Sequence, residues 1–151
     1  AGGQLALVTA LRFKEQGEWL PRKQILIYPM LDAEGKSDSY QENGKQLVIT
    51  RPMLLSGFEM YVAGSGVSAR HPEISPLFRD DLSGLPTTYI VTAEFDPLRD
   101  EGEQLYKLLI ENGVEAYCDR YLGVIHGFFQ LSGVSQSAVR CIENVARHIS
   151  S

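Results

Sequence analysis

Two segments carry side chains whose types and spacing could perform acid–base chemistry. The segment "TAEFDPLRDEGEQL" places Asp96 directly after an apolar run, and "YLGVIHGFFQL" places His126 beside a glycine in a later turn. A carboxylate that orients an imidazole and stabilises its cation makes that imidazole an effective general base. The sequence therefore predicts a catalytic pair, provided that the fold brings these two turns together.

The elements around this pair alternate in type along the chain. Apolar runs of strand length are separated by amphipathic stretches, so we expect an α/β fold with about three mainly parallel strands and flanking helices. The expected strands are 24–31 and 87–96, which should be buried on both faces, and 114–123, which should lie nearer an edge. The expected helices are 3–16, 50–64, 97–113 and 134–149, and 32–46 is expected to be a loop. Helix 3–16 is apolar on most sides and should be buried, with Gly17 at its end, and helix 50–64 should present an apolar stripe that includes Met53, Phe58 and Tyr61. Asp96 ends the second strand and His126 follows the third. Because active sites of such sheets lie beyond the carboxyl ends of the strands, the two residues are expected at one edge.

Each of these residues also has a simpler interpretation. Asp96 precedes Pro97 at a helix start, where a carboxylate often caps free N–H groups. His126 lies among apolar residues and could be a core histidine, although Gly127 favours a loop. Asp100 and Glu101 are first-turn acids, which usually interact with the helix dipole at the surface. We expect these last two residues to have structural roles only, and the sequence leaves open whether Glu101 orients local backbone.

Composition excludes several classes of protein. The chain has 151 residues, enough for about one domain, and a net charge of −5 without a basic cluster, which disfavours nucleic-acid and anionic-membrane partners. No apolar run approaches the ~20 residues of a membrane span, and no signal-peptide pattern opens the sequence. Cys118 and Cys141 are expected to be buried thiols of a cytoplasmic protein. The histidines and cysteines show no metal-ligand spacing, so no metal is expected.

Longer matches make the comparison with a known family specific. The segments "DPLRDEGE", "YLGVIHGF" and "LIYPML" resemble the acid, base and preceding-strand segments of α/β-hydrolases of the hormone-sensitive-lipase-like esterase family. The opening "AGGQLA" resembles the end of that family's Gly-Asp-Ser-Ala-Gly-Gly nucleophile elbow. The resemblance covers all of 1–151, and it implies a partial domain whose nucleophile, oxyanion loop and first strands lie upstream.

The resemblance assigns a role to each matching position. It implies that Asp96 is the triad acid and His126 the general base, while the backbone N–H of Ala1 contributes to the oxyanion hole. Gly2 and Gly3 match the glycines that permit the sharp turn of the elbow. No serine within this chain has an equivalent setting, because the nearest candidate, in "AGSGV", follows a helix rather than a strand.

The resemblance therefore implies a serine esterase that acts on small short-chain esters without a cofactor, with this chain inactive alone. An alternative is a non-catalytic α/β module for binding or dimerisation. A nucleotide-binding or redox domain is disfavoured, because the glycine fingerprint and the Cys-x-x-Cys motif are both missing from the sequence. Apolar surfaces that an upstream sheet would cover predict a homo-oligomer or another association.

Overall fold

The structure is a computed structural model that describes residues 1–45 and 48–151. Its elements are α1 (Gly2–Gln16), β1 (Lys23–Ile27), α2 (Asp38–Asn43), α3 (Arg51–Val62), η1 (Pro76–Phe78), β2 (Thr87–Phe95), α4 (Arg99–Glu111), β3 (Ala116–Ile125), η2 (Phe128–Gln130) and α5 (Gln136–Ser150). The expected alternation of helices and strands is confirmed.

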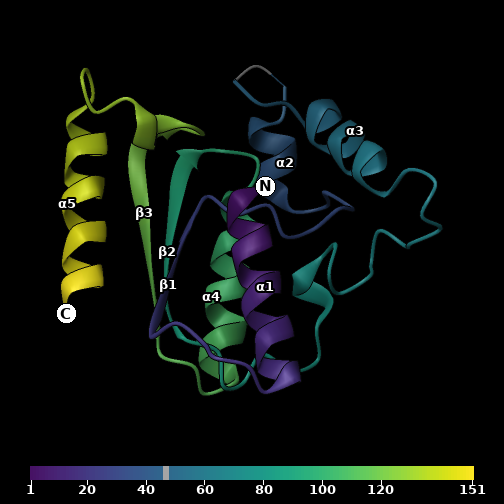
Figure 1. The fold of residues 1–151 in the computed structure, drawn as a ribbon. Helices are drawn as coiled ribbons and strands as arrows, with labels where there is room; N and C mark the ends of the chain where they lie inside the picture. Colours follow the sequence, from purple (N-terminus) through teal and green to yellow (C-terminus); the bar gives the residue numbers. More distant parts are fainter. Residues whose placement is uncertain (46–47) are drawn as a thin grey trace.

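The strands form one parallel sheet in the order β1-β2-β3. Helices α1 and α4 cover one face of the sheet and α5 covers the other (Figure 1). The core on the α1–α4 side includes Leu7, Leu11, Leu26, Ile90, Leu105 and Leu109. The core on the α5 side includes Tyr89, Val91, Ala93, Ala138 and Cys141. The predicted fold class, an α/β structure with a parallel sheet and flanking helices, is therefore confirmed.

The strands differ in how completely they are buried. Apart from its ends, β2 is buried on both faces, as its continuous apolar sequence predicts. In β1 only alternate residues are fully buried, so the prediction of a strand buried on both faces is wrong there. This strand lies at one edge of the sheet, and Ile25 and Ile27, which alternate with the buried residues, are only partly buried against the core on the α5 side. The expected edge position of β3 is confirmed.

Three further expectations need correction. The predicted loop 32–46 contains the short helix α2, and its last residue lies outside the described part of the chain. Helix α1 is buried on one face only, because Leu5 and Phe13 are exposed. In α3, Phe58 is buried but Met53 and Tyr61 are exposed, so its apolar residues do not form one buried stripe. Gly17 ends α1 in the left-handed conformation, as predicted.

Candidate active site

Asp96 and His126 lie in hydrogen-bond contact at the carboxyl edge of the sheet. Asp96 directly follows β2 and His126 directly follows β3, and these strands are paired in parallel. The Nδ1 atom of His126 is 2.8 Å from Oδ2 of Asp96. Because a carboxylate oxygen accepts, Nδ1–H donates and Nε2 is left free to take a proton. The structure thus brings together the two side chains that the sequence paired.

Burial makes this contact asymmetric. Asp96 is fully buried, whereas the His126 side chain keeps 23% of its surface exposed. A buried carboxylate with a fixed partner has little freedom to reorient, and the partly exposed ring remains within reach of a reacting molecule. This is the arrangement that a general base and its orienting acid require.

The capping interpretation of Asp96 is correct only in part, because α4 begins at Arg99 with Leu98 as its N-cap and has no side-chain cap hydrogen bond. The second oxygen of Asp96, Oδ1, accepts a hydrogen bond of 2.9 Å from the backbone N–H of Leu98. One oxygen therefore fixes the turn that leads into α4, and the other faces His126. The contact to Leu98 orients the carboxylate instead of competing with its contact to the imidazole.

A local irregularity places His126 above Asp96. The pairing of β2 with β3 shifts register between Ala93 and Phe95. At this point the Gly123 N–H donates to the Glu94 carboxylate at 2.7 Å. Gly127, with a φ of 88°, then turns the chain away from the sheet immediately after the histidine. A residue with a Cβ would be strained in that conformation, so the glycine allows His126 to end the strand.

The residues matched to the nucleophile elbow lie at the same end of the molecule. The amino terminus and the start of α1 are found beside the carboxyl ends of the strands (Figure 1). A Cβ on Gly3 would lie 2.9 Å from the Cβ of Pro29, closer than real Cβ atoms approach, whereas one on Gly2 would meet nothing within 4 Å. Close packing against Pro29 therefore requires a glycine at position 3.

Glu101 orients backbone from inside the molecule, a role that the sequence left open. This residue is only 1% exposed, and its Oε2 accepts from the Leu31 N–H at 2.9 Å. Its Oε1 lies 3.2 Å from the hydroxyl of Tyr40, which donates to it. Burial raises the pKa of Glu101 well above its ordinary value. The carboxyl also lies near the Ala1 nitrogen: burial, the larger effect, lowers the pKa of the Ala1 amine, and Glu101 partly opposes this. The prediction that Glu101 is a surface acid is therefore wrong.

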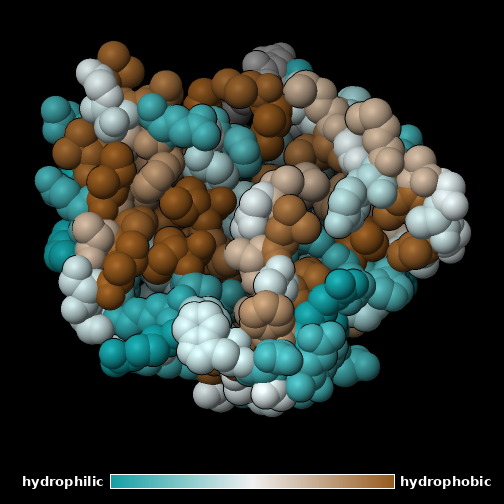
Figure 2. Space-filling view, in the orientation of Figure 1, coloured by the Kyte–Doolittle hydropathy of each residue, from teal (hydrophilic) through white to brown (hydrophobic). Residues whose placement is uncertain are grey.

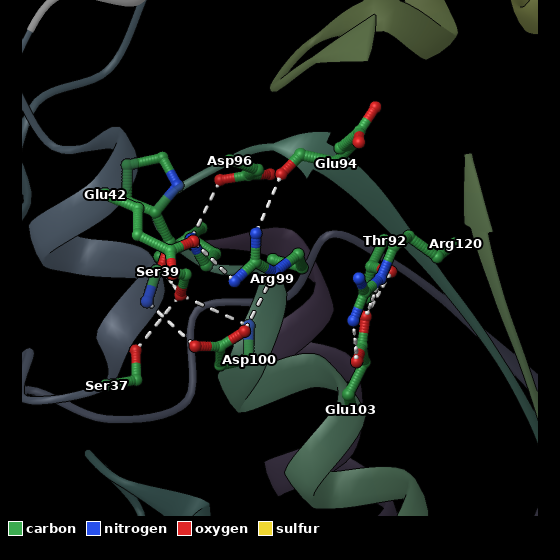
Figure 3. A network of polar contacts seen from close by, with 12 residues as sticks. Ser37, Ser39, Glu42, Thr92, Glu94, Asp96, Arg99, Asp100, Glu103 and Arg120 are labelled. Atoms are coloured by element: carbon green, nitrogen blue, oxygen red, sulfur yellow. Dashed lines mark hydrogen bonds and ion pairs between the residues drawn. The ribbon is translucent and has the colours of Figure 1, made fainter. Parts of the chain in front are cut away.

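Asp100 also contacts the segment between β1 and α3. Its Oδ2 accepts from the Ser39 N–H at 2.8 Å, while the Ser39 hydroxyl donates to the carbonyl of Pro97. Arg99 donates to Asp100, to Glu42 and to the backbone carbonyl of Glu94, as Figure 3 shows. Asp100 therefore ties the start of α4 to α2, and Ser39 and Arg99 add bonds to the backbone on either side of Asp96. A sequence signal for this role was the number of acids in one short turn, more than a helix dipole requires.

Other features of the described residues bear on the class of site. Within 1–45 and 48–151, no group of three or more histidine, cysteine, aspartate or glutamate side chains could hold a metal ion. No helix in the same ranges is long and apolar enough to cross a membrane. A cavity of about 550 Å³ is lined by residues of α2 and α3, among them Tyr40 and Arg51, and includes neither Asp96 nor His126.

Comparison with known proteins agrees with this geometry. A family model described as the α/β-hydrolase fold matches residues 1–130. The carboxylic ester hydrolase LipN of Mycobacterium tuberculosis is 35% identical over 99% of this chain, and an arylesterase of Saccharolobus solfataricus is 37% identical over 85% of it. The chain spans 42% of the length of each of these relatives.

A solved structure gives the same result in three dimensions. The esterase of Pyrobaculum calidifontis superimposes on 99% of this chain with a TM-score of 0.91 and 37% identity, and the match takes in 49% of that esterase. The predicted resemblance to hormone-sensitive-lipase-like esterases is thereby confirmed. With the family model covering most of its length, the chain belongs to the α/β-hydrolase fold family.

Proposed function

We propose that this chain supplies the acid and the base of a serine esterase that cleaves short-chain carboxylic esters. The observation that carries the proposal is the 2.8 Å contact between Nδ1 of His126 and Oδ2 of Asp96 at the carboxyl edge of the sheet. The relatives named as ester hydrolases support the choice of reaction. The nucleophile of the proposed enzyme is a serine that directly precedes Ala1 in a longer protein.

The first half of the proposed reaction acylates this serine. Its Oγ attacks the ester carbonyl carbon while Nε2 of His126 takes the hydroxyl proton. Asp96 stabilises the resulting imidazolium, and backbone N–H groups, including that of Ala1, hold the oxyanion. When the tetrahedral intermediate collapses, the bond to the alcohol oxygen breaks and His126 returns the proton to the leaving alkoxide.

The second half releases the acid. Water attacks the acyl carbon and transfers a proton to Nε2 of His126, and the bond between the acyl carbon and Oγ breaks as the serine regains a proton. The carboxylic acid is the second product. Each proton taken up by His126 is returned within the same half-reaction, so the proposed cycle needs no cofactor.

The alternative role, as a binding or dimerisation module, is favoured by exposed apolar surface. Figure 2 shows apolar side chains gathered between α5 and α1. Leu5 is 50% exposed and Ile149 is 64% exposed. Surface of this kind promotes association, so we propose that the isolated chain forms a homo-oligomer or binds the segment that its relatives carry upstream. A monodisperse monomer in sedimentation velocity would contradict this.

The proposed function is tested by extending the chain at its amino terminus. The codons upstream of Ala1 are read, and the extended protein is treated with a serine-directed organophosphonate and assayed on p-nitrophenyl acetate. The proposal predicts a Gly-x-Ser sequence before Ala1, one covalent label on that serine, and turnover that the label abolishes. An extended protein that is neither labelled nor active would favour the binding module instead.

We also propose a cytoplasmic location for the protein. The free thiols of Cys118 and Cys141 support this location.

A further inference from the structure

Tyr28 has an unusual backbone conformation beside the candidate base. Its φ is 35°, and it is the non-glycine residue with a positive φ in the described ranges. A bulky side chain is strained in this region, and the proline that follows disfavours helical backbone at the same position. Strained residues of this kind concentrate at functional sites, where the surrounding structure holds them in place.

Contacts on both sides enforce this conformation. The Tyr28 N–H donates to the Val91 carbonyl at 2.8 Å, which continues the pairing of β1 with β2 by one residue. Three residues later, the Leu31 N–H is held by Glu101 at 2.9 Å. Between these anchors Pro29 packs against Gly3 of α1. The turn from Tyr28 to Leu31 is therefore fixed to β2, to α4 and to the residues matched to the nucleophile elbow.

The strained backbone carries the Tyr28 ring against His126. The two ring centroids are 4.2 Å apart, with an angle of 51° between the planes. The Tyr28 ring also lies 6.2 Å from the ring of Phe128, which is buried. Asp96 holds one ring atom of the histidine by a hydrogen bond, and the aromatic contact limits rotation of the imidazole about that bond. The π face of Tyr28 also offers a favourable surface to an imidazolium.

The hydroxyl of Tyr28 stays protonated beside His126. Burial, reinforced by the nearby charge of Asp96, raises the pKa of the Tyr28 hydroxyl above its ordinary value. The side chain therefore remains a neutral phenol around neutral pH. It presents an aromatic ring rather than a phenolate to His126.

We infer that Tyr28 is a positioning residue, whose ring keeps the His126 imidazole in the orientation needed for proton transfer. This inference rests on the proposed esterase function. It adds a residue from the turn after β1 to the pair formed by the turns after β2 and β3. Because Tyr28 acts through His126, its removal should slow the chemical step and leave substrate binding nearly unchanged.

The test uses the extended, full-length protein with Tyr28→Phe, Tyr28→Leu and Tyr28→Asn. Tyr28→Phe keeps the ring, so its kcat should stay within about twofold of wild type. Tyr28→Leu removes the ring, and Tyr28→Asn removes it while tolerating the left-handed backbone. Both should lower kcat by about ten- to a hundredfold with little change in KM, since small misplacements of a base are costly. Tyr117→Leu, at an exposed tyrosine of β3, is the matched control and should leave kcat unchanged.

Thermal unfolding identifies the variants that are folded. The activity of His126→Ala distinguishes failure of the positioning role of Tyr28 from failure of the proposed esterase function. If His126→Ala is inactive while folded Tyr28→Leu or Tyr28→Asn retains wild-type kcat, the positioning role is overturned and the esterase function stands. If His126→Ala remains active, the proposed function itself fails. A kcat loss in Tyr28→Phe as large as that in His126→Ala also overturns the inference, because the hydroxyl and not the ring would then be required. This last comparison can overturn the inference even if neither ring-deleting variant folds.

Discussion

The Leu31 N–H and the Glu101 carboxyl are joined by a hydrogen bond of 2.9 Å inside the molecule, where both residues are at most 1% exposed. The bond links the turn after β1 to the first turn of α4. The turn after β1 contains Tyr28, which contacts the candidate base, and Pro29, which packs against Gly3. Glu101 therefore supports both contacts indirectly. An acid that follows the catalytic candidate Asp96 closely in sequence thus stabilises the surroundings of the site.

Removal of the Glu101 side chain should destabilise the protein. Glu101→Ala leaves the buried Leu31 N–H and the Tyr40 hydroxyl without a partner, which should lower the free energy of unfolding by about 1–3 kcal/mol. Glu101→Gln retains an acceptor and should lose less. Urea unfolding measures both changes in the extended protein. Glu111→Ala, on the exposed end of the same helix, is the control and should change stability by less than about 0.5 kcal/mol. Equal losses at 101 and 111 would contradict this role.

The protonation of Glu101 should make stability depend on pH. Burial raises the folded-state pKa of Glu101 well above its ordinary value of 4.5. The folded protein therefore holds this proton more tightly than the unfolded chain does. The associated stability is fully present below about pH 4.5 and is lost as the pH rises through the folded-state pKa.

Glu101→Gln, which cannot ionise, should lack this contribution. The groups close to Glu101 that also carry or can acquire charge are Asp32, Tyr40 and the Ala1 amine, and the amine becomes an uncharged amide in the extended protein. The free energy of unfolding is measured from pH 4 to pH 9 for wild type and for the variant. As the pH rises, the free energy of unfolding of wild type should fall steadily relative to that of Glu101→Gln. Parallel curves would show that Glu101 does not titrate differently in the folded state.

The two glycines that begin α1 should respond differently to alanine. In Gly3→Ala the new Cβ meets the Cβ and Cα of Pro29 at 2.9 and 3.1 Å, so backbone must move. We expect a loss of about 1–3 kcal/mol in the free energy of unfolding, as for other overpacked sites. Gly2→Ala has open space and is the matched control, with no loss expected. If the two variants unfold at the same urea concentration, the close approach of α1 to Pro29 is wrong.

Much of the fold and of the candidate pair could be predicted from the sequence. Asp96 and His126 follow apolar runs of strand length, and parallel strands present their carboxyl ends at one edge. The expectation that Asp96 and His126 lie at the same edge of the sheet therefore follows from the order of the helices and strands along the chain. The family resemblance added the identification of Ala1, Gly2 and Gly3 with a nucleophile elbow, and these roles remain predictions.

The missed features depend on contacts between distant segments. Helix α2 is too short to be signalled by periodicity, and it is fixed by bonds from Ser39 and Tyr40 to the start of α4. Glu101 has the sequence setting of a surface acid, and only the fold covers it. The left-handed conformation of Tyr28 contradicts the preferences of both tyrosine and a residue before proline. Local propensity cannot reveal a conformation that tertiary contacts impose against it.

The central claim is that Asp96 and His126 act as acid and base, and kcat/KM of their variants tests it most directly. In the extended protein, Asp96→Asn and His126→Ala should each lower kcat/KM on p-nitrophenyl acetate by about 10³- to 10⁴-fold. His71→Ala, at an exposed histidine remote from the pair in sequence, is the control and should retain wild-type turnover. Thermal unfolding confirms that each variant is folded. Near-normal hydrolysis by folded Asp96→Asn or His126→Ala would contradict the assignment.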